Sequence, residues 1–173
     1  MERLKREPGG WGVALGGAIA LVSIFFAWVS VTNPSARNAT WKTGLFHTVT
    51  GQTIGFLGLL AMIAGLGLVA SRGGGRIWWA ILGLFGMGVV LAAAAIAIFA
   101  PKTFAAWIAT TETISTLALT QRQESINSTI TSNFDSGVIS ASVAFGAFVG
   151  LLAGLLGVAG SILGFRKKRE TVD

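Results

Sequence analysis

Four long stretches without a charged residue dominate this chain and restrict it to folds that lie in a membrane. They cover residues 11–31, 51–70, 77–99 and 137–165. About 20 helical residues, rising 1.5 Å each, cross roughly 30 Å of hydrocarbon. In that medium the backbone must satisfy its own hydrogen bonds, which a helix does within one segment. We therefore expect an all-α membrane protein with four transmembrane helices.

The composition agrees with this expectation and excludes several kinds of site. Charged residues make up 12% of the 173 residues, about half of the roughly 25% typical of soluble domains. The chain has no cysteine, which excludes disulfides, zinc–thiolate sites, iron–sulfur clusters and c-type haem attachment. The net charge of +6 comes from basic residues beside apolar stretches. We interpret it as a signal of membrane topology and expect no nucleic-acid partner.

The positions of the basic residues predict the orientation of the chain. The N-terminus, the turn at 71–76 and the C-terminus hold three, two and four of the thirteen basic residues. The longer segments 32–50 and 101–136 hold the other four. Because Lys and Arg accumulate on the cytoplasmic side, we expect both termini in the cytoplasm of a bacterial plasma membrane. Segments 32–50 and 101–136 then lie on the outer side.

Glycines at helical spacing predict where the transmembrane helices touch. In the last apolar stretch they recur every three or four residues, which keeps them on one helix face opposite the leucines. In a bilayer such a stripe lets another helix approach closely. The leucine face meets either lipid or another protein. The predicted helix-packing residues are Gly12, Gly16, Gly51, Gly55, Gly58, Gly146, Gly150, Gly154, Gly157, Gly160 and Gly164.

The outer segment 101–136 is predicted to contact a partner. Trp107 lies in a short amphipathic stretch that suits the membrane interface. Ile126, Ile130 and Phe134 are spaced four apart and lead into the last apolar stretch. We therefore expect the last helix to begin early and to extend on the outer side, with these three residues and Trp107 as partner contacts.

Two further patterns concern the ends of the apolar stretches and the outer segments. A basic cluster after the last stretch is expected either to attract anionic lipid headgroups or only to stop transfer through the membrane. Its members are Arg166, Lys167, Lys168 and Arg169. Glycosylation sequons begin at Asn38 and Asn127, both on the predicted outer side.

Ionisable residues are absent from all four apolar stretches. Ion-coupled transporters and proton relays usually place such a group at membrane depth, so a transporter acting alone is disfavoured. His47 is the single histidine, and Glu112, Glu124 and Asp135 have no metal-ligand spacing. We therefore predict no catalytic residue, no metal site and no cofactor.

The N-terminal part of the chain resembles a known family. Trp28–Val31 closes the first apolar stretch, Val49-Thr50-Gly51 opens the second, and a short turn at Arg72–Arg76 follows. This pattern is similar to the four-pass actinobacterial proteins called Trp-associated membrane proteins. The resemblance implies a four-pass plasma-membrane protein from a family without an assigned biochemical activity. The longer segment 101–136 departs from that family's pattern.

A second pattern resembles the claudins, which are also four-pass membrane proteins. Trp28 followed by Gly44-Leu45-Phe46 is similar to their W…GLW motif in the first outer loop. Here phenylalanine replaces the last residue of the motif, and the paired cysteines are missing.

The sequence is compatible with three functions. The first is a non-catalytic accessory or assembly subunit of a larger membrane complex, of a respiratory or envelope-transport type, with other integral membrane subunits as partners. The second is a small homo-oligomeric channel or transporter, which needs a polar pore although the stretches offer few polar residues. The third is a lipid-acting enzyme that uses Glu112, Glu124 or His47 at the outer surface.

Overall fold

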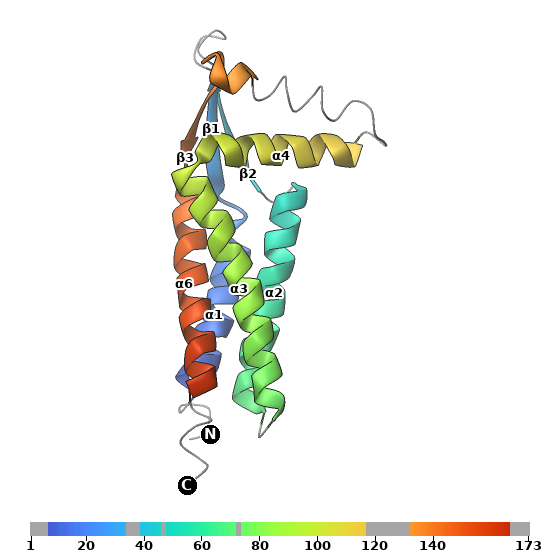
Figure 1. Ribbon diagram of the computed structural model, residues 1–173, viewed down its shortest axis with the longest axis vertical. Helices are drawn as coiled ribbons and strands as arrows, with labels where there is room; N and C mark the ends of the chain where they lie inside the picture. Colours follow the sequence, from blue (N-terminus) through green and yellow to red (C-terminus); the bar gives the residue numbers. More distant parts are fainter. Residues whose placement is uncertain (1–6, 34–38, 46–47, 72–73, 117–131, 167–173) are drawn as a thin grey trace. The chain divides into compact units, whose positions relative to one another are not determined.

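The computed structural model describes residues 7–33, 39–45, 48–71, 74–116 and 132–166 (Figure 1). Helices make up most of it, and a small antiparallel sheet accompanies them. In chain order the elements are α1 (Pro8–Ser23), β1 (Ala27–Asn33), β2 (Ala39–Gly44), α2 (Val49–Ala70), α3 (Gly75–Phe99), α4 (Pro101–Thr116), β3 (Ser140–Val143) and α6 (Phe145–Arg166).

The chain divides into two compact units. A helical unit comprises Met1–Ser23, Ile54–Ala92 and Val149–Asp173. A sheet unit comprises Ile24–Thr53 and Ala93–Phe148. Each unit combines segments that are far apart in the sequence, so neither is a contiguous domain.

Three helices are long and apolar enough to cross a membrane. α2, α3 and α6 have 22, 25 and 22 residues, and their apolar windows contain almost no charge. At 1.5 Å per residue each reaches the roughly 30 Å of a hydrocarbon core. They agree with the prediction of an integral membrane protein and with the predicted stretches 51–70 and 77–99.

The first predicted span, 11–31, is wrong at its C-terminal end. α1 has 16 residues and stops at Ser23, and residues 27–33 form β1 instead. Apolarity alone does not distinguish a helix from a strand. From Val29 onward, however, valines alternate with Ser30 and Thr32, and this period of two is typical of a half-buried strand.

The early start of the last helix is also wrong. α6 begins at Phe145, and it is preceded by β3 rather than by an outward helical extension. Gly137 has a φ of +74°, which closes a turn after a short helical segment at 132–135. Serines at 140 and 142 alternate with Ala141 and Val143, again a strand pattern. Ile126 and Ile130 lie outside the described residues.

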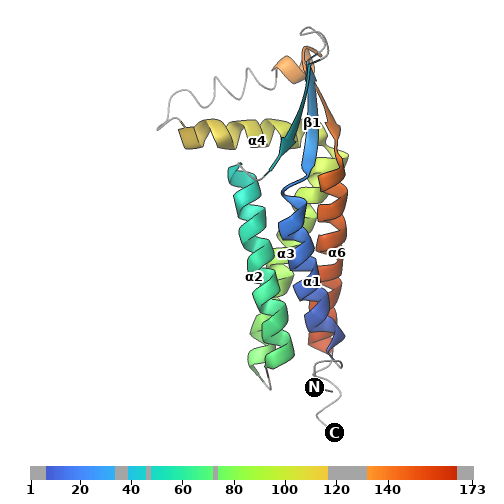
Figure 2. The same cartoon turned by 180° about the vertical axis from the view of Figure 1, so that it is seen from behind.

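The structure is mostly helical, and a small three-stranded sheet, which we did not expect, accompanies the helices. The strand order of the sheet is β2-β1-β3, with both pairings antiparallel (Figure 2). Val29 pairs with Val143 on one side and with Thr43 on the other. The register with β2 shifts between Ala27 and Val29, so Trp28 is the extra residue of a β-bulge. Thus β1, which comes early in the chain, is the central strand.

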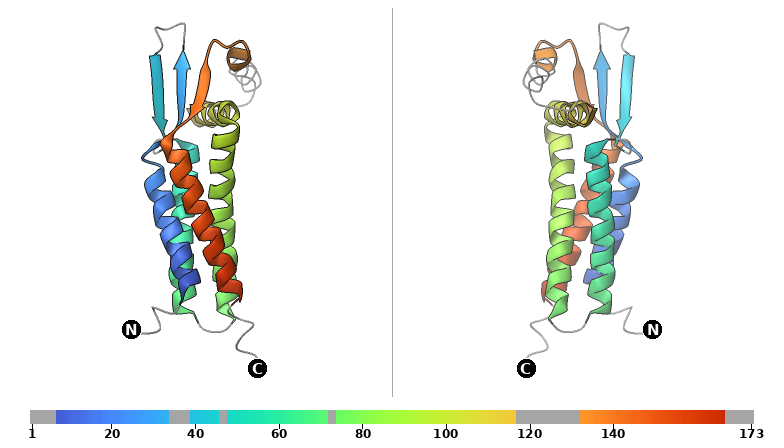
Figure 3. Two further views of the ribbon diagram at one scale, coloured as in Figure 1. Left: turned by 90° about the vertical axis from the view of Figure 1, so that its left-hand side faces the viewer. Right: turned by 90° about the vertical axis from the view of Figure 1, so that its right-hand side faces the viewer.

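α4 packs against β1 and β3 within the sheet unit (Figure 3). Phe104, Ala105 and Ile108 form its buried face. Together with Trp28 and Val29 they make the core of this unit. The exposed serines of β3, at 140 and 142, lie on the other face of the strand.

Candidate functional site

The glycines of α1 and α6 bring these two helices into backbone contact. A Cβ added at Gly16 would lie 2.8 Å from the Ala153 oxygen, and one at Gly9 would lie 2.8 Å from the Gly160 oxygen. A Cβ at Gly12 would lie 3.1 Å from the Gly160 Cα. These distances leave no room for a side chain, so the two helices meet along a stripe of small residues.

A second glycine face of α1 contacts α2. A Cβ at Gly10 would lie 2.9 Å from the Gly65 oxygen, and one at Gly17 would clash with the backbone of Gly58 and Met62. Gly10 and Gly17 were not among the glycines predicted from the sequence. The signal is present in the doublets Gly9-Gly10 and Gly16-Gly17, because neighbouring residues differ by about 100° around a helix. Each doublet therefore serves two faces.

The remaining predicted glycines have different surroundings. Gly154 and Gly157 of α6 lie against Leu91 and Met87 of α3. Gly146 belongs to the sheet unit, where an added Cβ would lie 2.5 Å from the Trp28 ring. Gly51 is buried and lies against Leu45. Gly55 and Gly150 are also buried. Gly164 lies beside Leu68 and Ala80.

Buried polar side chains in the helical unit are satisfied within their own helices. Ser23 and Ser161 are fully buried. Ser23 Oγ donates a hydrogen bond to the Ala20 oxygen at 2.7 Å, and Ser161 Oγ donates to the Gly157 oxygen at 2.9 Å. Both hydroxyls thus donate to backbone oxygens of the preceding turn of their own helix.

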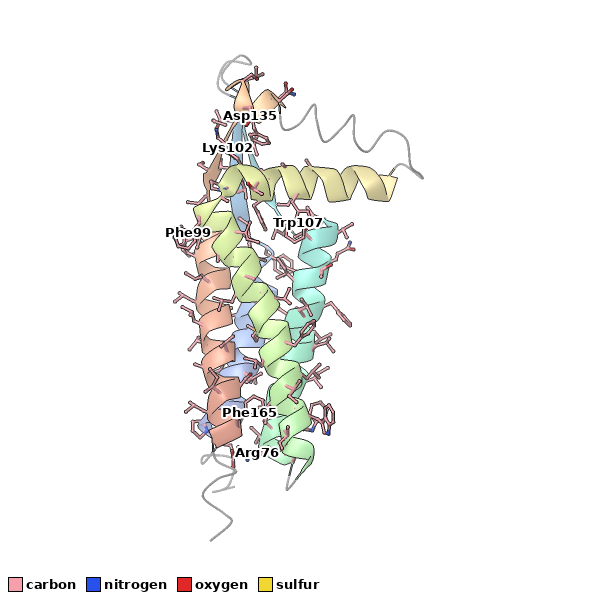
Figure 4. All side chains as sticks on the ribbon, in the orientation of Figure 1. Arg76, Phe99, Lys102, Trp107, Asp135 and Phe165 are labelled. Carbon is pink, nitrogen blue, oxygen red and sulfur yellow. The ribbon has the colours of Figure 1, made fainter. Side chains whose placement is uncertain are left out.

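An ion pair joins three segments of the helical unit. Arg76 Nη2 lies 2.5 Å from Glu7 Oε2, and Arg76 Nε donates a 3.3 Å hydrogen bond to the Gly164 oxygen. The Arg76 and Glu7 side chains are only 16% and 17% exposed. The start of α1, the start of α3 and the end of α6 therefore meet at one end, where Figure 4 places Arg76 next to Phe165.

Aromatic residues of the sheet unit form a continuous row. The Trp28 and Phe104 rings are stacked with centroids 5.9 Å apart, and Phe104 meets Trp107 edge-on at 6.0 Å. Trp28 and Phe104 are fully buried, whereas Trp107 is 46% exposed. Phe134, which we expected to contact a partner, is 6% exposed and belongs to the core. The row therefore presents one indole at the surface on a rigid base.

Most of the acids and basic residues selected for chemistry or lipid contact have side chains that the structure does not describe. Asp135 is exposed, and Glu112 lies in the part of α4 where only the backbone is described. Among the described residues no group of three His, Asp or Glu could hold a metal ion. The remaining candidates whose side chains lie outside the described residues are His47, Glu124, Arg166, Lys167, Lys168 and Arg169.

A groove of about 430 Å³ lies on α3 in the helical unit. It is lined by Trp78, Trp79, Ile81, Leu82 and Phe85. All five side chains are apolar or aromatic, so the groove suits a hydrocarbon ligand rather than a polar one.

Comparisons of the chain with protein-family models, with curated proteins and with solved structures found no match in any of the three.

Proposed function

We propose that this protein is a non-catalytic accessory or assembly subunit of a larger membrane complex in a bacterial plasma membrane. The helices of its helical unit cross the bilayer, with α1 as the fourth, shorter span. They pack against one another through their glycine faces. Its sheet unit lies on the outer side and contacts another integral membrane subunit. The complex is of a respiratory or envelope-transport type.

The observation that carries this proposal is the exposed indole of Trp107 on a buried aromatic base. Phe104 is fully buried and holds Trp107 edge-on, while Trp28 supports Phe104 from the sheet. Tryptophan is enriched among the residues that dominate protein interfaces, since it buries a large area with few rotatable bonds. A side chain already fixed in position loses little entropy when it binds.

The proposed orientation is supported by the distribution of basic residues along the sequence. Through Arg76, Glu7 and Gly164, the start of α1, the start of α3 and the end of α6 lie together. The N-terminus, the segment 71–76 and the C-terminus, which adjoin these three places in the sequence, contain nine of the thirteen basic residues. The positive-inside rule then supports cytoplasmic termini.

Native electrophoresis of membranes solubilised in a mild detergent tests the proposal. We expect the wild-type chain to migrate in an assembly larger than itself, and Trp107→Ala to release it. Thr103→Ala is the matched control, because Thr103 is also exposed on α4 but does not belong to the aromatic row. Release by both variants would contradict the proposal. Ion flux through liposomes that contain this protein alone would also contradict it and would favour the small homo-oligomeric channel instead.

A further inference from the structure

We infer that α4 lies along the membrane surface, in the headgroup layer of the bilayer, at the end where α3 leaves the hydrocarbon. The exposed side of α4 that carries Trp107 then contacts phospholipid where hydrocarbon and headgroups meet. This inference goes beyond the accessory role, because it fixes the depth at which Trp107 is presented whether or not a subunit binds there.

A tight corner joins α3 to α4, so the end of the first helix sets the depth of the second. Only Ala100 lies between them. Its nitrogen donates a 2.8 Å hydrogen bond to the Ile96 oxygen, and its oxygen accepts a 3.0 Å bond from the Phe104 nitrogen. Pro101 cannot continue α3, because it lacks an N–H. The turns of α3 from Ala93 onward belong to the sheet unit, in which α4 runs across the end of α3 (Figures 1 and 2).

The exposed side chains beside this corner locate the boundary of the hydrocarbon. Phe99, the last residue of α3, is 84% exposed, and Phe145, the first of α6, is 66% exposed. Both helices are long and apolar enough to cross a membrane, and exposed rings at their ends are more stable in hydrocarbon than in water. Lys102 is exposed and positively charged, and a charge is costly in hydrocarbon. The boundary therefore lies between Phe99 and Lys102, which places the start of α4 in the headgroup layer.

The sides of α4 have the chemical character that this depth requires. Phe104 and Ile108 are buried, so the side toward the sheet is occupied. Lys102 and Trp107 are both exposed and lie about 140° apart around the helix, on opposite flanks of the buried side. Trp107 points to the side from which α3 arrives, and Lys102 points away from it (Figure 4). Tryptophan is enriched at the hydrocarbon boundary, whereas the charged end of a lysine is stabilised in the wet headgroup layer.

The depth of α4 restricts the partner of the accessory role. The stacked rings of Trp28 and Phe104 hold α4 against β1 and fix its rotation about its own axis. Its 16 residues extend for about 24 Å along the membrane surface. If the proposed function holds, a subunit that contacts Trp107 must present its own contact at headgroup depth, where transmembrane helices end.

Spin labelling of the purified full chain in liposomes of phosphatidylethanolamine and phosphatidylglycerol tests this depth. The chain has no cysteine, so one nitroxide at a time can be attached at Phe99→Cys, Lys102→Cys, Thr103→Cys or Asp135→Cys without other changes. All four positions are exposed, so the labels leave the core intact, and Trp107 is retained. Relaxation by oxygen, which concentrates in hydrocarbon, and by a water-soluble nickel chelate gives the depth of each label.

Neighbouring positions on opposite sides of α4 give the decisive comparison. Thr103 lies one turn before Trp107 on the same side of the helix, whereas Lys102 lies on the other side. We expect the label at Thr103 to lie deeper than the label at Lys102 by up to about 10 Å, the diameter of a helix. The label at Phe99 should be reached mainly by oxygen and the label at Asp135 mainly by the chelate.

Two results would overturn the inference. Chelate access at Thr103 equal to that at Asp135 would show that α4 stands clear of the membrane. Labels at Thr103 and Lys102 that are both as deep as the label at Phe99 would place α4 inside the hydrocarbon. Because Trp107 is unchanged in all four variants, neither result decides the electrophoresis test of the accessory role, so the two proposals can fail separately.

Discussion

The Trp28 indole stacks on the Phe104 ring, with centroids 5.9 Å apart and planes 19° apart. Trp28 bulges from β1, and Phe104 lies in the first turn of α4. The contact therefore joins the segment after α1 to the segment after α3, and it places the aromatic row at the centre of the sheet unit.

Trp28→Ala should unfold the sheet unit at lower denaturant concentration than any other single aromatic truncation in it. A fully buried aromatic side chain replaced by alanine costs about 3–5 kcal/mol through lost burial and a residual cavity. Trp107→Ala, at a 46% exposed indole, should cost much less. Denaturant titration in detergent with limited proteolysis measures both; equal destabilisation would show that Trp28 is not the centre of this core.

Gly16→Ala should destabilise the helical unit, although alanine is the better helix former. The added methyl carbon would lie 2.8 Å from the Ala153 oxygen, too close for any carbon–oxygen contact. Gly88→Ala is the control, because nothing lies within 4 Å of an added Cβ there. It should gain up to about 1 kcal/mol from helix propensity. Thermal stability in detergent should fall for the first variant only, and a fall for neither would refute the close α1–α6 contact.

The ion pair of Glu7 and Arg76 should show energetic coupling. Both side chains are largely shielded from water, so removing one partner leaves the other charge poorly solvated. In a double-mutant cycle with Glu7→Gln and Arg76→Gln, we expect a coupling free energy of about 1–3 kcal/mol. Thermal unfolding of the four proteins provides the cycle. Strictly additive effects would mean that the two side chains act separately.

Gly137 should tolerate asparagine better than alanine. Its φ of +74° is costly for most residues, by about 1–2 kcal/mol, and asparagine adopts it more readily. No atom lies within 4 Å of an added Cβ, so the backbone alone decides the outcome. We expect Gly137→Ala to lower the melting temperature of the protein and Gly137→Asn to lower it less; the reverse order would contradict the turn geometry.

The membrane helices were predictable from the sequence because length and the lack of charge are sufficient criteria for them. The strands were not, because residues 27–31 and 140–143 belong to the same uncharged stretches as the helices. Two alternations distinguish these strands from helices, that of Val29 and Val31 with serine and threonine and that of Ser140 and Ser142 with apolar residues, and each covers few residues. The apolar character of both stretches therefore gave no sign that β1 pairs with β3, which lies far away in the chain.

The helix contacts were partly predictable. Gly154, Gly157 and Gly160 of α6 lie against neighbouring helices, whereas Gly146 lies against Trp28 of β1. α1, with glycines on two faces, contacts both α2 and α6. A single-helix pattern cannot show which neighbour each face meets. The aromatic row and the groove on α3 depend on how side chains pack in three dimensions, so hydropathy alone could not indicate either of them.

The position of β1 between β2 and β3 has a consequence for synthesis of the protein. Ser140 and Ser142 meet the carbonyl oxygens of Thr32 and Ser30, across 108 and 112 residues of chain. A ribosome completes β1 long before it reaches β3, so one edge of the central strand stays open while α2, α3 and α4 are made. Only a chain translated past β3 can close the sheet. Arrested or truncated products would therefore carry an unpaired strand edge, a feature by which the cell's proteases can distinguish them from the finished protein.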